Sequence, residues 1–258
     1  MREVPLLGLR LLDLDAAAVA GLLAARPASA PFAYLVTPNA DHFVRLARRP
    51  GLRELYRQAR WRCLDSQAIA RLGGLLGLHL PRVAAGADIV ARLLDCHLQA
   101  GDRLTVIGLC SEGVAALQHR LPEVTIAHHA PPMGLLHNGA GFAAAAAFAG
   151  SHPARFTLLA LGSPVQEMLA RAIASDDRAT GVGLCIGAGL DFWLGHKRRA
   201  PRLMRRLGLE WLFRLSQEPE RLWKRYLVDD WAVLRFLVLE RRQSREARPP
   251  SWMPGPPV

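Results

Sequence analysis

Short apolar runs alternate along most of the chain with longer segments in which apolar positions recur at helical spacing. The runs are Phe32–Val36, Leu104–Ile107, Val124–Ala127, Phe156–Leu161 and Gly181–Ile186. Strands that are apolar on both faces and alternate with helices are typical of a parallel sheet that is covered on both sides. Residues 1–195 are therefore predicted to form an α/β catalytic domain, a Rossmann-like parallel sheet with helices on both faces.

Loops that contain glycine or proline follow four of these runs. They are residues 37–41, 108–113, 162–167 and 187–191. Ligands of such sheets bind beyond the carboxyl ends of the strands, where backbone N–H groups and helix N-termini face an anion. A tight turn alone explains the glycine or proline of each loop equally well, so the loops indicate a binding edge only when taken together.

The pattern changes after Gly195, where basic and apolar residues recur at helical spacing. Proline is tolerated in the first turn of a helix, so Pro219 predicts that one helix ends near Gln217 and another begins near Glu218. Basic amphipathic helices that carry tryptophan are typical of elements on a membrane surface. A solvated face over an ordinary core helix gives the same pattern. Residues 196–242 are predicted to form this helical appendage, and residues 243–258, with five prolines, a disordered tail.

Positive charge is concentrated in the appendage. The chain has 33 lysines and arginines against 22 acidic residues, a formal charge of +11. Ten basic residues and only three acidic ones lie between Lys197 and Arg225. A field of this sign attracts nucleic acid, anionic lipid or phosphorylated small molecules, so the question of partners concerns mainly this segment.

Nothing in the chain predicts secretion or a membrane span. No run of about 20 uncharged apolar residues occurs, and acidic residues interrupt the apolar N-terminus. The four cysteines are far apart and form no CxxC pair, which favours buried thiols in a reducing compartment. The protein is predicted to be cytoplasmic, and any contact with a membrane to be peripheral.

Several segments together resemble the WecG/TagA/CpsF family of bacterial glycosyltransferases. The matching segments, in order, are TPNADHFVRL from Thr37, CLDS from Cys63, GADIV from Gly86, LGSPVQE from Leu161 and RRAPRLMRRLGLEWLFRLSQEPERLWKRY ending at Tyr226. The last of these is long and specific, and the resemblance spans residues 36–226.

The resemblance implies an inverting transferase that moves N-acetylmannosamine or a related hexose from a UDP-sugar to a polyprenyl-diphosphate-linked saccharide. Such enzymes act at the inner face of the plasma membrane in the assembly of exopolysaccharide, teichoic acid or common antigen. It further implies that no metal or other cofactor is needed, that the anionic membrane surface is a partner, that the appendage closes the active site, and that a homo-oligomer can form. No nucleic acid is expected as a partner.

Asp65 is the candidate catalytic base. An inverting transfer needs a group that takes the proton of the acceptor hydroxyl, and Asp65 matches the aspartate of the family pattern. By position alone, a helix N-cap is the commoner role for an aspartate after a strand. Many relatives have glycine where this chain has Ser66, a difference that leaves the carboxylate in place but can alter the acceptor.

Further site residues follow from the same resemblance. Thr37 is assigned to the catalytic group, and Asn39 to sugar binding, although a turn with a helix cap explains both residues equally well. The remaining candidates for substrate binding are Arg82, Gly108, Gly162, Ser163, Pro164, Gln166, Glu167 and Asp191. Many relatives have a basic residue where this chain has Val165, so a charge contact from that position is absent.

Cations for the leaving diphosphate are expected from the appendage. Arg214, Arg221 and Arg225 match family positions, and the planar guanidinium group binds phosphate oxygens in a bidentate manner.

Two other functions compete with this interpretation. The basic helices also suit a nucleic-acid-binding protein, although tryptophans and a dense apolar face exceed what phosphate contacts require. An NAD-dependent oxidoreductase would suit the predicted sheet, but the loop after Ile107 lacks the G-x-G-x-x-G spacing.

Overall fold

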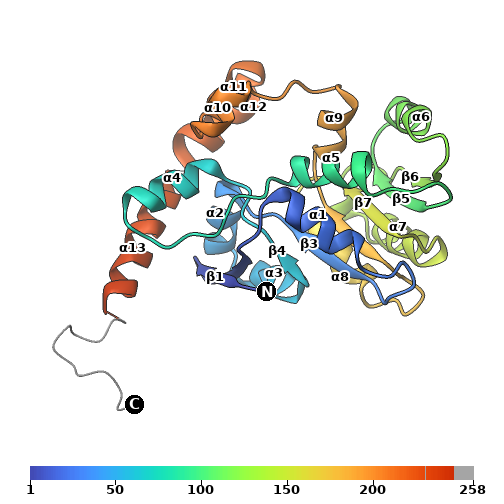
Figure 1. Cartoon of the computed structure of the whole chain (residues 1–258), viewed down its shortest axis with the longest axis horizontal. Coiled ribbons are helices and arrows are strands. Elements are labelled where there is room, and N and C mark those ends of the chain that lie inside the picture. The colour runs from blue at the N-terminus through green and yellow to red at the C-terminus, as the bar shows by residue number, and fades with distance from the viewer. Residues whose placement is uncertain (230, 247–258) are drawn as a thin grey trace, which may run out of the picture.

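A computed structural model describes residues 1–229 and 231–246 (Figure 1). Its centre is a six-stranded sheet in the order β4-β3-β8-β7-β5-β6, in which all neighbouring strands are parallel. The strands are β3 (Ala33–Val36), β4 (Trp61–Arg62), β5 (Arg103–Gly108), β6 (Thr125–His129), β7 (Phe156–Ala160) and β8 (Val182–Cys185). The predicted α/β fold with a parallel sheet is confirmed, and each of the five apolar runs contains most of a strand.

Two hydrophobic clusters cover the two faces of the sheet, because successive strand residues point to opposite sides. Tyr34 and Val36 belong to one cluster and Leu35 to the other. The helices on the Leu35 side are α1 (Ala16–Ala24), α5 (Gly86–Cys96), α6 (Ser111–Arg120) and α9 (Gly189–Leu194). Those on the Tyr34 side are α2 (Ala40–Arg48), α3 (Arg53–Gln58), α7 (Gly139–Ser151) and α8 (Val165–Ile173). The core is therefore double, and the sheet separates its halves.

A small hairpin precedes this sheet and is not predicted by the sequence pattern. β1 (Glu3–Leu6) and β2 (Leu9–Leu12) pair antiparallel around Leu7 and Gly8, which both have positive φ. The hairpin lies beside the edge strand β4, where the Arg62 Nε donates to the carbonyl oxygen of Arg10 over 2.7 Å. Almost every position from residue 4 to residue 12 is apolar, so neither a helical nor an alternating period stands out.

Four helices and a π-helical turn follow the sheet. They are α10 (Arg202–Arg206), α11 (Glu210–Gln217), α12 (Pro219–Lys224), η3 (Arg225–Asp229) and α13 (Ala232–Glu246). The predicted break at Pro219 is present, but Gly208, with φ +72°, also divides the first helix in two. α13 extends to Glu246, beyond the predicted end of the appendage at residue 242. The rest of the predicted tail, residues 247–258, lies outside the described residues.

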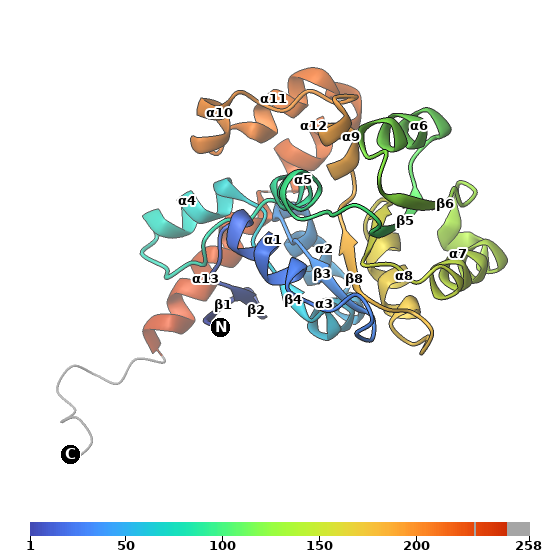
Figure 2. The same ribbon diagram turned by 45° about the vertical axis from the view of Figure 1, so that its right-hand side comes forward.

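The appendage covers one end of the domain. α10–α12 stand above α4 (Gln67–Leu75) and α5, whereas α13 returns past α2 and α4 (Figure 2). Among residues 1–229 and 231–246, none of the helices combines the length and apolar character that a bilayer-spanning segment requires.

Candidate active site

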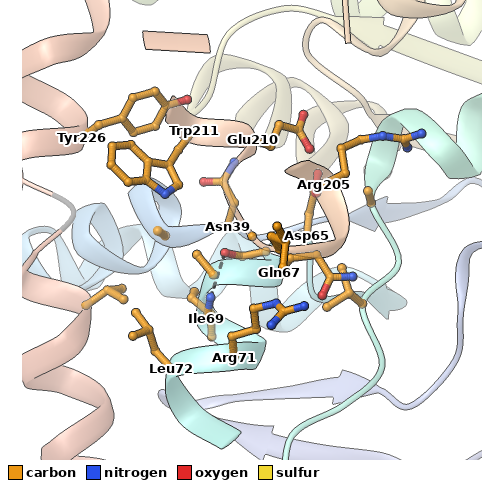
Figure 3. Close-up of a pocket in the computed structure, with 18 of the residues that line it drawn as sticks. Asn39, Asp65, Gln67, Ile69, Arg71, Leu72, Arg205, Glu210, Trp211 and Tyr226 are labelled. Atoms are coloured by element: carbon orange, nitrogen blue, oxygen red, sulfur yellow. Dashed lines mark hydrogen bonds between the residues drawn. The ribbon is translucent and has the colours of Figure 1, made fainter. Parts of the chain in front are cut away.

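A cavity of about 700 Å³ lies between the sheet domain and the appendage. The domain contributes side chains from the starts of α2 and α4 and from the first turn of α5, and the appendage contributes residues of α10, α11 and η3. In Figure 3, Trp211 and Tyr226 lie together on one side of the cavity, Arg205 and Glu210 lie on the other, and Asp65 is below them. The volume of the cavity is typical of small-molecule sites.

Asp65 reaches the cavity because β4 continues alongside the loop that follows β3. The Cys63 N–H donates to the Val36 carbonyl oxygen over 3.1 Å, and the Asp65 N–H donates to that of Pro38 over 3.0 Å. Parallel pairing thus extends past both strand ends and holds Asp65 beside Thr37. The polar residues that follow two neighbouring strands meet at one edge, as the fold requires.

The carboxylate of Asp65 accepts a hydrogen bond from the first turn of a different helix. The Gly86 N–H at the start of α5 donates to Asp65 Oδ2 over 3.1 Å, and no side chain of the residue preceding α5 caps that helix. A β-carbon on Gly86 would lie 2.8 Å from Thr37 Oγ1 and 3.6 Å from Asp65 Oδ2. Only glycine permits this close approach of α5 to Thr37 and Asp65.

The alternative role of Asp65 as the N-cap of α4 is taken by its neighbour. Ser66 occupies the N-cap position, and its Oγ accepts from the Ile69 N–H over 3.2 Å. Serine at this position therefore starts the helix, while the Asp65 carboxylate remains on the cavity wall.

Burial raises the pKa of Asp65 to about 6. The Gly86 hydrogen bond and the charges of Arg214 and Arg199 oppose this effect, whereas Glu210 adds to it. A carboxyl group that titrates near neutral pH can accept a proton and release it again, which is what a general base requires.

Three arginines that line the cavity are held by carboxylates. Arg199 is paired with Asp88, and Arg205 Nη1 lies 3.5 Å from the same carboxylate. Arg214 Nη2 donates to Glu210 Oε1 over 2.9 Å. Each of the three keeps a buried Nε–H that has no hydrogen-bond partner among the described residues. The positive charge of these three side chains lines the cavity, where it can attract an anion.

The sequence motifs did not single out several of these cavity residues. Asp88 lies within GADIV, and Arg199 and Arg205 lie within the basic run, but neither segment indicates which members face the cavity. Spacing from Asp65 gives no information either, since tertiary folding alone brings the appendage to this edge.

Arg221 and Arg225 cannot be placed with Arg214. Arg221 belongs to α12 and Arg225 begins η3, but their side chains lie outside what the structure describes. Tyr226, the next residue of η3, lines the cavity.

Gln166 and Glu167 form a buried polar cluster at the start of α8, and neither lines the cavity. The Gly187 N–H donates to Gln166 Oε1 over 2.8 Å, which joins the loops after β7 and β8. Glu167 Oε1 accepts from the Tyr56 hydroxyl and from Gln166 Nε2. Ser163 Oγ lies 3.5 Å from the Tyr56 hydroxyl. Gly162 and Pro164, on either side of Ser163, belong to the loop that leads into α8.

Three predicted site residues lie away from the cavity lining. Arg82 is exposed and pairs with Asp13, with Nε 3.5 Å from Oδ1. Gly108 ends β5, where a β-carbon would meet the Ala160 carbonyl oxygen at 2.5 Å, so its glycine serves strand packing. Asp191 lies in the first turn of α9. The structure does not bring these three to Asp65.

Asn39 does line the cavity, and it is also the N-cap of α2. The candidate residues that the structure gathers in one place are thus Asp65, Asn39 and Arg214, with Thr37 immediately behind Asp65.

Comparison with known families agrees with this geometry over almost the whole chain. The model of the "Glycosyl transferase WecG/TagA/CpsF family" matches residues 4–247. The match includes the strands that present Asp65 and Asn39 as well as every described helix of the appendage. This chain belongs to the WecG/TagA/CpsF family of glycosyltransferases.

Proposed function

We propose that the chain transfers N-acetylmannosamine or a related hexose, with inversion, from a UDP-sugar to a polyprenyl-diphosphate-linked saccharide during cell-surface polysaccharide synthesis. The observation that carries the proposal is the meeting of Asp65, whose pKa is raised to about 6, with three arginines in one cavity. Because the chain belongs to a glycosyltransferase family, we prefer this function to nucleic-acid binding and to an NAD-dependent oxidoreductase.

The arginines suit the diphosphate of the donor. Arg199, Arg205 and Arg214 line the cavity, and each remains charged at any physiological pH. Asp88 and Glu210 hold these side chains in place before the donor arrives. Cations supplied in this way stabilise the departing diphosphate, so we propose that the enzyme needs no metal ion.

The chemical step is a single displacement. The acceptor hydroxyl oxygen attacks the anomeric carbon of the donor sugar, and the bond from that carbon to the diphosphate oxygen breaks. Asp65 takes the hydroxyl proton, while the electron pair of the broken bond leaves with UDP, whose charge the arginines hold.

The rim of the cavity suits an acceptor that is bound to lipid. Leu72 and Trp231 line it, and both are exposed, Trp231 by 64%. The appendage also exposes Leu203, Leu212 and Trp223 among its basic residues. Apolar and basic groups together favour attachment to anionic lipid. We propose that the enzyme works as a peripheral protein at the inner face of the plasma membrane.

Product formation tests the proposal. Purified protein is incubated with a panel of UDP-sugars and a short-chain prenyl-diphosphate saccharide, with and without EDTA, and the anomeric configuration of the product is determined by NMR. We expect an inverted product that forms equally well with EDTA. Asp65→Asn should abolish turnover, whereas Asp177→Asn, the same change at an exposed carboxyl group, should not. Full turnover by Asp65→Asn would remove Asp65 as the base.

A further inference from the structure

Asn39 is held by a reciprocal pair of contacts at the start of α2. The His42 N–H donates to Asn39 Oδ1 over 3.3 Å, and the Asn39 N–H donates to His42 Nδ1 over 3.1 Å. This is a capping box in which histidine takes the place that glutamate or glutamine usually occupies.

The capping box decides which end of the Asn39 amide faces the ligand. A backbone N–H is always a donor, so the side-chain atom that faces the His42 N–H is the oxygen. His42 Nδ1 lies on the same side, 2.8 Å from Oδ1, and a proton on Nδ1 would bind that oxygen as well. Neither contact uses the amide nitrogen. Because Asn39 also lines the cavity, it presents N–H donors there (Figure 3).

The other edge of the His42 ring faces a buried carboxylate. His42 Nε2 lies 3.8 Å from Glu167 Oε1, and Glu167 is only 1% exposed. The Tyr56 hydroxyl donates to the same oxygen over 3.2 Å and Gln166 Nε2 over 3.0 Å. A carboxylate opposite Nε2 favours a hydrogen on that nitrogen. Nδ1 then accepts from the Asn39 N–H when it carries no hydrogen and donates to Asn39 Oδ1 when it carries one, so either form joins the ring to Asn39.

We propose that His42, oriented by Glu167, is a positioning residue that fixes the Asn39 amide with its N–H groups toward the cavity. The group bound there is accordingly a hydrogen-bond acceptor, a sugar hydroxyl or acetamido oxygen. This inference rests on the proposed function for the identity of the ligand as a sugar, whereas the orientation of Asn39 follows from the capping box alone. It also gives Glu167 a role that does not require contact with substrate.

Two substitutions at His42 separate the parts of this arrangement. His42→Leu removes the contacts of the ring with Asn39 and with Glu167, while the backbone N–H of residue 42 can still donate to Asn39 Oδ1. His42→Gln retains an acceptor for the Asn39 N–H, since glutamine is a usual partner in a capping box. We expect kcat/KM to fall at least about 10-fold in His42→Leu and to return to within about threefold of wild type in His42→Gln. His119→Leu, at an exposed histidine of α6, should behave as wild type.

In His42→Leu, we expect KM to rise for only one of the two substrates. An effect on the KM of the UDP-sugar assigns Asn39 to the donor, and an effect on the KM of the prenyl-linked saccharide assigns it to the acceptor. A merely structural role would lower the melting temperature and reduce both activities together. Such a result, or unchanged kinetics in His42→Leu, overturns the proposal.

The ring itself provides a readout that does not depend on turnover. Proton–nitrogen NMR of protein with ¹⁵N-labelled histidine should show hydrogen on Nε2 of His42 in the wild type. Glu167→Gln should weaken that preference, because a neutral amide no longer favours a donor at Nε2. Hydrogen on Nδ1 alone in the wild type overturns the proposal. Absence of any sugar transfer by the wild type contradicts the proposed function instead, and the NMR result then decides the orientation of Asn39.

Discussion

The Asp65 carboxyl group is subject to opposing influences that leave its pKa near 6. Burial favours the neutral form, while the Gly86 N–H and the charge of Arg214 favour the anion. An exposed carboxylate would be a weaker base, and one buried without a donor would remain protonated at neutral pH. The environment of Asp65 thus matches the task of accepting one proton in each turnover.

The pH dependence of the transfer should report this group. Only the ionised form of Asp65 can accept a proton, so activity falls as the pH drops below its pKa. We expect kcat/KM to be half-maximal near pH 6, to fall about tenfold per pH unit below that value and to level off above it. Initial rates from pH 4.5 to 8.5 measure the profile. A profile that stays flat down to pH 5 would contradict the assignment.

Asp65→Asn should lower the activity of the enzyme and raise its stability. A raised pKa means that the folded state favours protonated Asp65. Ionisation of Asp65 therefore lowers the free energy of unfolding as the pH rises. The effect is absent below pH about 4, where the group is protonated in both states, and is complete above pH about 6, where it is ionised in both states. Asparagine removes this cost and can still accept from the Gly86 N–H. We expect unfolding to require roughly 1–3 kcal/mol more at pH 8, with little difference at pH 4, and turnover to fall at least about 100-fold.

Urea unfolding at both pH values measures the difference. A variant that is less stable than wild type at pH 8 would show that ionised Asp65 stabilises the fold, and the raised pKa would then be wrong.

At the scale of elements, the start of α5 is the part of the fold that the site depends on most. Its first N–H group binds Asp65, its first residue has no room for a β-carbon beside Thr37, and Asp88 in the same turn holds Arg199 and Arg205. One helix N-terminus thereby places the base and the cations relative to each other.

Gly86→Ala should damage both stability and activity. The new β-carbon would lie 2.8 Å from Thr37 Oγ1, so α5 or Thr37 must shift. We expect a loss of about 1–3 kcal/mol of stability and a fall in kcat/KM of at least about 10-fold, because a shift of α5 weakens the hydrogen bond from the backbone N–H of residue 86 to Asp65. Gly21→Ala is the matched control, since a β-carbon in α1 meets nothing within 4 Å. That variant should gain up to about 1 kcal/mol and keep wild-type kinetics, as thermal melting and initial rates would show.

Five of the six strands of the described parallel sheet were predictable, because strands buried on both faces read as short apolar runs, whereas the two-residue strand β4 (Trp61–Arg62) is not such a run. The β1–β2 hairpin was not, since Val4 through Leu12 are too uniformly apolar to show a period. The break at Gly208 was missed for a related reason, as one glycine within a helical pattern does not require an end.

Of the cavity lining, two positions that follow strand ends could be predicted from the sequence, namely Asn39 and Asp65. The pairing of Arg82 with Asp13 was not, because ion pairs between distant segments leave no local signal.

At the scale of the whole molecule, the two tasks that we propose for the appendage fall on different sides of it. One side of α10–η3 closes the cavity with Arg205, Arg214 and Tyr226. Other positions, among them Arg198 and Lys224, are exposed. The basic excess between Lys197 and Arg225 is therefore shared between substrate binding and the proposed contact with lipid.

Charge reversal outside the cavity should separate these tasks. Arg198→Glu combined with Lys224→Glu lowers the formal charge of +11 by four. Each basic residue near an anionic surface contributes about 1 kcal/mol, so sedimentation with vesicles that contain anionic lipid should weaken at least about 10-fold at low salt. Turnover with a short-chain, water-soluble acceptor should stay within about twofold of wild type, because neither side chain lines the cavity.

The matched control makes the same change elsewhere. Arg57→Glu combined with Arg103→Glu removes the same charge from two exposed residues of the sheet domain, on α3 and at the amino end of β5. If net charge alone drew the protein to lipid, both double variants would lose binding equally, and the appendage would not be the membrane-facing element. If only the appendage variant loses binding to the anionic vesicles, the contact lies on the appendage. The cavity mouth, with Trp231 exposed beside it, would then open toward the lipid that carries the acceptor.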